Sequence, residues 1–306
     1  MFDFIFKIEK STPSHISFRI FGIKLNCLKP GIKKERKKIA QYYQSFKSAS
    51  DIPKAQGGLR LIQQANAGFL KLFDRICQEN NFNYWIDFGT LLGSIRHNGF
   101  IPWDDDIDVS MLREDYERFI EQFKNGFENY PELEITFENN KRNKCFIKIQ
   151  HKHSENLFID IFPYDKYHSE LSNEEKILLS EKITEFRNKK TTKKFKTIDD
   201  IRNNFKKITQ EKILENKKIE SETPAIFMGV DFPHKWKNKA FDWNVIFPLQ
   251  RINFEHIQVN APNMPKIVLE KIYGNYMSIP KDSYPRHSSY LDINENERNI
   301  LENIAK

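Results

Sequence analysis

The sequence predicts an α/β (α+β) fold in which a mixed sheet is flanked by helices and carries an added helical segment. Three patterns lead to this prediction. Apolar residues recur at helical spacing from Leu59 to Gln78, short strand-like segments follow between residues 84 and 162, and residues 172–220 have a long helical periodicity. The chain has 306 residues, 39% hydrophobic and 30% charged, which allows a sizeable core and excludes wholesale disorder.

The expected elements alternate along the chain. A hairpin-like pair of strands broken at Gly22 comes first, and the helix at 59–78 ends at Asn80-Asn81. Gly274 is the usual left-handed cap for a helix over 265–273. Between these, we expect a strand at 84–88, a glycine-rich turn with a brief helix, a strand at 106–112, an amphipathic helix over 116–123, and strands at 133–137, 145–150, 157–162, 249–252 and 256–259.

Basic residues outnumber acidic ones by 49 to 42, which gives a formal net charge of +7. They cluster at residues 33–38, 141–152 and 187–196. Such clusters suit phosphate-bearing substrates or an anionic membrane surface, and for the first and third clusters solvated helix faces are an equal alternative. The clusters lack the interleaved aromatic residues of a stacking platform, so no nucleic-acid partner is expected.

The cysteines and the apolar segments bear on the compartment. Three cysteines are widely spaced and form no C-x-x-C unit, so neither a zinc site nor a disulfide framework is indicated. The segment MFDFIFKIEK lacks the order of a signal peptide, and no stretch approaches the roughly 18 apolar residues of a membrane span. We therefore expect a cytoplasmic protein, with the inner face of the membrane as a candidate contact.

An acidic run supplies the candidate metal site. In Asp106-Ile-Asp108-Val, alternate strand positions point the two carboxylates to one face, where they can bind Mg²⁺ or Mn²⁺. Asp160, alone in the apolar segment Leu-Phe-Ile-Asp-Ile-Phe, is the candidate third carboxylate, because a buried Asp needs a neutralising partner. The alternative for the acidic run is a solvated loop or a helix N-terminus.

Small residues before the acidic run are candidate phosphate contacts. Leu92-Gly93-Ser94 is expected to open a helix after a strand, where backbone N–H groups can approach a phosphate, and Gly89-Thr90 can contribute similarly. Arg96 and His97 follow as candidate donor-phosphate contacts. A surface salt bridge for Arg96 and a satisfied structural histidine are the alternatives.

Three further side chains complete the candidate substrate-binding set. Lys148 alternates with apolar residues on an expected strand and can contact substrate phosphate or neutralise the aspartates. Trp103 and Tyr164 can stack on a base or enclose a quaternary ammonium, with core packing as the alternative for each.

These motifs resemble a known family. A hydrophobic-Gly-Ser element, a spacer, Asp-x-Asp and a later isolated Asp resemble the DNA polymerase beta-like nucleotidyltransferase superfold. The fuller strings Asp87-Phe-Gly-Thr-Leu-Leu-Gly-Ser-Ile-Arg-His97 and Ile101-Pro-Trp-Asp-Asp-Asp-Ile-Asp108 resemble the LicD family of phosphotransferases, to which the fukutin-related proteins also belong. The resemblance covers roughly residues 59–290, and the cysteine-rich zinc loop of the animal members is not seen.

The resemblance implies an enzyme that transfers a phospho-alcohol, most simply phosphocholine, from a CDP-activated donor such as CDP-choline. The acceptor would be a sugar hydroxyl of a cell-surface glycan, such as lipopolysaccharide or capsule. It also implies a catalytic domain over 51–306 with a helical insertion around 170–220. The resemblance leaves residues 1–50 unexplained, and we expect them to form a small appendage, with contact to a membrane or partner as the alternative. The family's metal carboxylates carry over to Asp104, Asp106, Asp108 and Asp160.

In this reading Asp106, Asp108 and Asp160 are the catalytic residues. Asp106 and Asp108 would hold the metal at the donor pyrophosphate, and Asp160 would be the base for the acceptor hydroxyl. Two alternatives remain open. An NTP-dependent nucleotidyltransferase acting on a sugar or small molecule would use the same carboxylates, and a catalytically dead binding protein would share only the fold.

Overall fold

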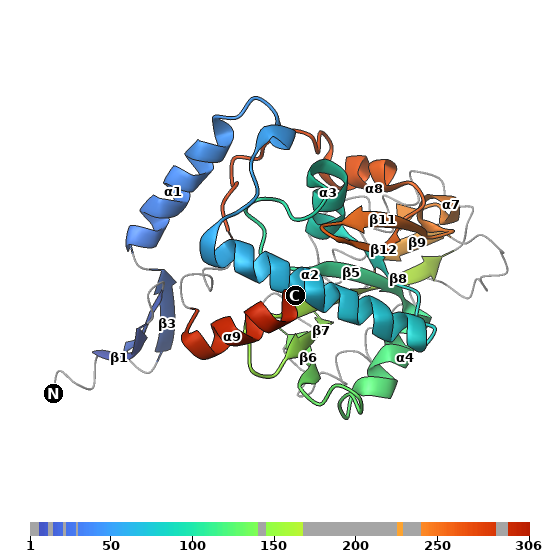
Figure 1. Ribbon diagram of the computed structural model, residues 1–306, viewed down its shortest axis with the longest axis horizontal. Coiled ribbons are helices and arrows are strands. Elements are labelled where there is room, and N and C mark those ends of the chain that lie inside the picture. The colour runs from blue at the N-terminus through green and yellow to red at the C-terminus, as the bar shows by residue number, and fades with distance from the viewer. Residues whose placement is uncertain are drawn as a thin grey trace.

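The computed structural model describes residues 6–11, 15–20, 23–28, 30–139, 145–167, 225–228, 240–285 and 293–306. Within these residues the expected mixed sheet with flanking helices is confirmed (Figure 1). The helical segment predicted at 172–220, the basic cluster at 187–196 and residues 141–144 of the second cluster lie outside the described residues.

A mixed sheet forms the centre of the protein. Strand β8 pairs in parallel with β5 on one side, and its other side pairs antiparallel with β7 and then with β9. β6 continues from β7, β10 from β9 and β4 from β5. The strand bounds are β4 (Trp85–Ile86), β5 (Asp108–Leu112), β6 (Leu133–Asn139), β7 (Cys145–His151), β8 (Phe158–Tyr167), β9 (Ala225–Met228) and β10 (Ala240–Phe241).

Helices pack against this sheet and against each other. The longest, α2, has apolar residues at helical spacing, and these form one buried face. In Figure 1, α2 crosses the near side of the sheet and α9 lies beside it, where the backbone oxygen of Ile304 leaves no room for a side chain at Gly68. The helix bounds are α1 (Pro30–Gln44), α2 (Gly57–Glu79), α3 (Phe88–His97), α4 (Arg113–Phe123), α7 (Trp243–Ile246), α8 (Pro265–Tyr273) and α9 (Glu295–Ile304), with a short 3-10 helix η2 (Ala49–Asp51).

The N-terminal strands form a separate small sheet. β2 (His15–Ile20) and β3 (Ile23–Leu28) are the predicted hairpin, and β1 (Phe6–Ser11) adds a third antiparallel strand that was not predicted. Figure 1 shows this sheet and α1 projecting to one side of the central sheet. Among the described residues, no helix combines the length and apolar character needed to cross a membrane.

Two predicted boundaries near the site are wrong. The helix begins at Phe88 instead of at Leu92-Gly93-Ser94, because the Asp87 carboxylate accepts the Phe88 N–H (2.8 Å) and caps the helix there. The strand predicted from residue 106 begins at Asp108, so Asp106 belongs to the preceding loop. The helix at 265–273 and its Gly274 end are confirmed, with a Gly274 φ of 66°.

A buried glutamate ties the loop that leads to the acidic run to the rest of the fold. Glu255 forms the turn between β11 (Gln250–Phe254) and β12 (Ile257–Ala261), and its side chain is 5% exposed. It accepts hydrogen bonds from Lys54 (2.7 Å), from both terminal nitrogens of Arg60 (2.9 and 2.8 Å) and from the Phe100 N–H (3.3 Å). The start of the loop is therefore fixed against α2.

The Glu255 clamp predicts a pH-dependent contribution to stability. Burial by itself raises the pKa of the Glu255 carboxyl, but hydrogen bonds and charges from Arg60 and Lys54 outweigh it and lower the pKa to about 2. A depressed pKa stabilises the fold above the unfolded value of 4.5, and this stabilisation is lost as the pH falls through about 2. Glu255→Gln is therefore expected to lower the free energy of unfolding by about 1–2 kcal/mol at pH 7.

Urea unfolding of both proteins at several pH values measures this contribution. The difference between wild type and Glu255→Gln should shrink from pH 4.5 towards pH 2. The exposed Glu128→Gln is the matched control and should change stability by less than about 0.5 kcal/mol. A difference that stays constant with pH would contradict the ion pairs as its origin.

Candidate functional site

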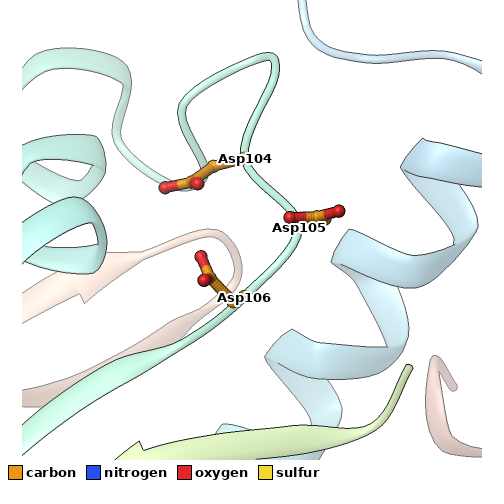
Figure 2. Close-up of side chains that lie close together, drawn as sticks. All are labelled: Asp104, Asp105 and Asp106. Carbon is orange, nitrogen blue, oxygen red and sulfur yellow. The ribbon is translucent and has the colours of Figure 1, made fainter. Parts of the chain in front are cut away.

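Three consecutive carboxylates lie in the loop before β5. Asp104, Asp105 and Asp106 each present one carboxylate oxygen within 4.8 Å of the others. Figure 2 shows the side chains of Asp104 and Asp106 on the same side of the loop, with the Asp105 side chain turned towards helix α2. Asp105 is also the most buried of the three, at 3% exposed. The geometry thus separates a facing pair, Asp104 and Asp106, from Asp105.

Asp108 joins the facing pair at the N-terminus of α3. A Cβ added at Gly89 would lie 2.6 Å from Oδ2 of Asp104 and 3.6 Å from Oδ2 of Asp108, so both carboxylates border the same space beside this glycine. The backbone N–H of Gly89 also donates to the Asp108 carboxylate. A helix N-terminus favours negative charge, and a residue without a Cβ lets the carboxylates approach it.

Crowding makes these carboxylates electrostatically unfavourable on their own. Burial raises the pKa of Asp104 well above its usual value, and the charges of Asp106, Asp105 and Asp108 raise it further. The pKa of Asp108 is raised by burial first and then by Asp106, Asp160 and Asp87. Hard divalent cations prefer several carboxylate oxygens as ligands, and a bound cation would offset the negative charge of these carboxylates. The residues present therefore fit Mg²⁺ or Mn²⁺.

The fourth predicted carboxylate lies on the neighbouring strand. Asp160 on β8 is directly opposite Asp108 on β5 in the parallel register, and its backbone N–H donates to the Ile107 oxygen (2.9 Å). On its other side Asp160 is opposite Lys148 of β7, whose Nζ lies 3.3 Å from Oδ1 of Asp160. Lys148 therefore faces the acidic residues through its contact with Asp160.

Two amide side chains of α2, which were not among the predicted site residues, hold the acidic loop. Gln63 donates to the backbone oxygens of Ile101 (3.2 Å) and Asp104 (2.8 Å). Asn66 donates to the oxygen of Asp105 (3.3 Å) and also to that of Asn156 before β8 (2.9 Å). The sequence contained a signal, because these two polar residues, three positions apart, interrupt the apolar face of the predicted helix.

Asp87 also helps to position the site, although the sequence motif that contains it did not predict a role for it. It is fully buried and accepts hydrogen bonds from Ser110 of β5 (2.8 Å) and Tyr164 of β8 (2.9 Å), besides capping α3. Burial and then the Asp87 charge raise the pKa of Tyr164, which stays a neutral donor. The Tyr164 ring packs edge-on against Trp85 with 1% exposure, so core packing is its role here and the expected substrate stacking is not supported.

The small residues of α3 differ in what they contact. Thr90 Oγ1 accepts the Asp108 N–H (2.8 Å) and so fixes the start of β5 beside the helix. Gly93 lies against the backbone of Gly99, and Ser94 donates to the Asn253 oxygen (2.7 Å). Gly93 and Ser94 are therefore packed inside the fold, and of the four predicted phosphate contacts only Gly89 lies against the carboxylates.

Arg96, His97 and Trp103 are engaged with protein groups. Arg96 is 7% exposed, donates to the backbone oxygens of Tyr276 (2.7 Å) and Ser278 (3.3 Å), and burial lowers its pKa to about 10. His97 Nε2 accepts from Arg96 Nε (2.9 Å), and burial followed by the Arg96 charge lowers the His97 pKa to about 4. Trp103 lies between the Tyr43 ring (4.9 Å) and the Arg96 guanidinium (5.9 Å).

Comparison with known proteins agrees with this arrangement. The model for LicD/FKTN/FKRP, nucleotidyltransferase domain, matches residues 81–192. Lipopolysaccharide cholinephosphotransferase LicD of Haemophilus influenzae is 37% identical over 130 residues, which are 39% of this chain and 48% of that protein. Ribitol 5-phosphate transferase FKRP of Homo sapiens is 33% identical over 82 residues, which are 26% of this chain and 16% of that protein.

The matched range and the site coincide. Residues 81–192 include the N-terminus of α3, the acidic loop, Asp108 and Asp160. The chain spans less than half the length of each of these curated relatives. The expected resemblance is confirmed, because residues 81–192 match the nucleotidyltransferase domain of LicD/FKTN/FKRP and two LicD- and FKRP-type phosphotransferases are similar to parts of the chain.

Proposed function

We propose that the protein transfers a phospho-alcohol, most simply phosphocholine, from a CDP-activated donor to a sugar hydroxyl of a cell-surface glycan. The observation that carries the proposal is the set of carboxylates gathered at the α3 N-terminus, within a LicD-type domain. The activities of the two relatives, a cholinephosphotransferase and a ribitol 5-phosphate transferase, support a phospho-alcohol donor for this chain.

Each residue of the site then has a chemical task. Asp104, Asp106 and Asp108 would hold Mg²⁺ or Mn²⁺, with Asp160 beside them on β8. The bound metal would supply the positive charge that a pyrophosphate leaving group requires. The N–H groups at the start of α3 add the positive end of the helix dipole on the same side.

The transfer itself needs a base and a leaving group. The acceptor hydroxyl would lose its proton to Asp160 as its oxygen bonds to the phosphorus that bears the alcohol, and the bond from that phosphorus to CMP breaks. CMP leaves with the electron pair, and Asp160 returns its proton to solvent. Lys148 Nζ lies 3.3 Å from Oδ1 of Asp160, so a positive charge stands beside this carboxylate.

The first prediction concerns donor identity and metal dependence. Incubation with CDP-choline, CDP-ethanolamine, CDP-glycerol or CDP-ribitol and a glycan acceptor should release CMP from one donor, with Mg²⁺ or Mn²⁺ and not with EDTA. Asp106→Asn and Asp108→Asn should each lower the rate at least about 100-fold. Asp105→Asn is the matched control, because its side chain points towards α2, and it should retain most activity.

The same assay separates the competing nucleotidyltransferase reaction. Release of pyrophosphate from an NTP, with no CMP from any CDP-alcohol, would overturn the proposed function while keeping the metal site. Equal losses in Asp105→Asn and Asp106→Asn would contradict the separation of their roles.

A second prediction concerns the space beside Gly89. In Gly89→Ala the added Cβ would lie 2.6 Å from the Asp104 carboxylate, so this carboxylate must move. Mn²⁺ should raise the Tm of wild type, because a ligand bound only by the folded state stabilises it. In the variant we expect this increase to fall by more than half, with a Tm in EDTA close to that of wild type. An unchanged response to Mn²⁺ would contradict the assigned ligand set.

A third prediction concerns the base. Asp160→Asn keeps the shape of the side chain but cannot accept the acceptor proton, and it should lower the transfer rate by about 10²–10⁴-fold. Rates measured with and without acceptor at saturating metal distinguish loss of the base from loss of metal. Near-normal turnover in this variant would remove Asp160 from the base role.

A further inference from the structure

A cavity of about 820 Å³ borders the carboxylate site through Lys148, the ion-pair partner of Asp160, and the proposed transfer mechanism assigns it no ligand. Its inner wall is formed by Lys148 and Gln150 of β7 and Phe158 of β8. Lys148 lies directly opposite Asp160, and Gln150 lies directly opposite Phe158. On each strand the two residues are two positions apart, so all four side chains lie on the same face of the strand pair. Lys148 therefore belongs both to the cavity wall and to the ion pair with Asp160.

The outer wall comes from the turn between β7 and β8 and from the first turns of α9. Glu297 of α9 accepts hydrogen bonds from Ser154 (2.9 Å) and Asn156 (2.7 Å) of that turn. These bonds join two segments more than 140 residues apart, so the wall is preformed. A ligand entering the cavity would meet a rigid rim, which reduces the entropy lost on binding.

The chemistry of the lining suits a neutral, hydroxyl-rich ligand. Two lysines, Lys148 and Lys152, are balanced by two glutamates, Glu155 and Glu297, and two histidines, His151 and His153, line the same cavity. Amide side chains also line this space; they are Gln150, Asn156, Asn294 and Asn296. Gln150 donates to Glu134 (2.7 Å), Asn156 donates to Glu297 (2.7 Å) and Asn294 accepts the Glu297 N–H (3.0 Å), and the other hydrogen-bonding capacity of the four amides suits sugar hydroxyls. Ile300 adds a small apolar surface that the C–H face of a sugar ring can cover, while the Phe158 ring lies under Lys148, whose Nζ is 3.6 Å from the ring centroid.

We propose that this cavity binds a neutral oligosaccharide, the acceptor of the transfer reaction, with its reactive hydroxyl directed past Lys148 towards Asp160. The volume lies within the range of roughly 300–1,000 Å³ that is usual for small-ligand pockets. Adjacent paired strands lie about 4.8 Å apart, so one strand spacing separates Lys148 from Asp160 and a second separates Asp160 from Asp108. The acceptor role rests on the proposed function, whereas saccharide binding does not.

An array of immobilised neutral oligosaccharides and of uronic-acid- or phosphate-bearing ones tests the proposal. Wild type should bind neutral members, and the affinity for the best of these is then measured by titration. Asn296→Trp places a large ring at an exposed position of the cavity lining and should raise the Kd at least about tenfold. Asn299→Trp is the matched control, the same exchange at an exposed position of α9 outside the lining, and its Kd should stay within about twofold.

Three results would overturn the proposal. They are binding of no oligosaccharide, binding of acidic members alone, and equal Kd values for the two tryptophan variants. Circular dichroism and Tm measurements check that both tryptophan variants fold. Asn296→Ala adds no bulk and is an independent variant, which should weaken binding less than Asn296→Trp.

Two further measurements separate this proposal from the proposed function. Asp106→Asn should lose transfer but bind the oligosaccharide as wild type does. If CMP is released from a CDP-alcohol, Asn296→Trp should raise the KM for the acceptor at least about tenfold and leave acceptor-independent CMP release unchanged. If no donor reacts but the Asn296→Trp effect on binding holds, the transfer function fails and the saccharide site stands.

Discussion

The mutual repulsion of closely spaced carboxylates is the constraint on which the arrangement around the site depends. Asp104, Asp106 and Asp108 border one small space, and their neighbours raise the pKa of Asp104 and Asp108. Left to itself, a loop of this composition would separate its charges. Three independent supports prevent this: the N–H groups at the start of α3, the α2 amides that bind the loop backbone, and the Glu255 clamp at its beginning.

These supports act on backbone atoms more than on the carboxylates. Gln63 and Asn66 donate to peptide oxygens, and Glu255 accepts a peptide N–H. The loop is therefore fixed in shape while the oxygens of its carboxylates remain turned towards one another. A fold that neutralised these carboxylates directly with arginines or lysines would be more stable locally, but it would fill the coordination positions that a cation needs.

Much of this could be predicted from the sequence, because periodicity reports directly on packing. The α2 helix, the hairpin at residues 250–261 and the strand that carries Asp160 follow from apolar spacing, and their confirmed bounds differ from the predicted ones by only a few residues. The proximity of Asp106 and Asp108 could also be predicted, because residues two positions apart lie close together in any backbone conformation.

What could not be predicted depends on tertiary contacts. Whether α3 begins at Phe88 or near Gly93 is decided by capping from Asp87, a residue whose other partners, Ser110 and Tyr164, come from two separate strands. Arg96 illustrates the same limit, because only the folded chain shows that its guanidinium is used to hold the backbone at Tyr276 and Ser278. A local motif indicates which side chains have the chemistry to bind a substrate. Segments distant in the sequence determine which of these side chains already bond to other protein groups.

The position of α9 has a consequence for how such proteins diversify. The helix lies against α2 and the β7–β8 turn, and it supplies none of the carboxylates. Exposed residues on its first turns that do not bond the β7–β8 turn, such as Asn296, can therefore be exchanged during evolution without disturbing the acidic loop. A lineage could in this way change what the protein recognises while its chemistry stays constant, because recognition and reaction are encoded in segments that mutate independently.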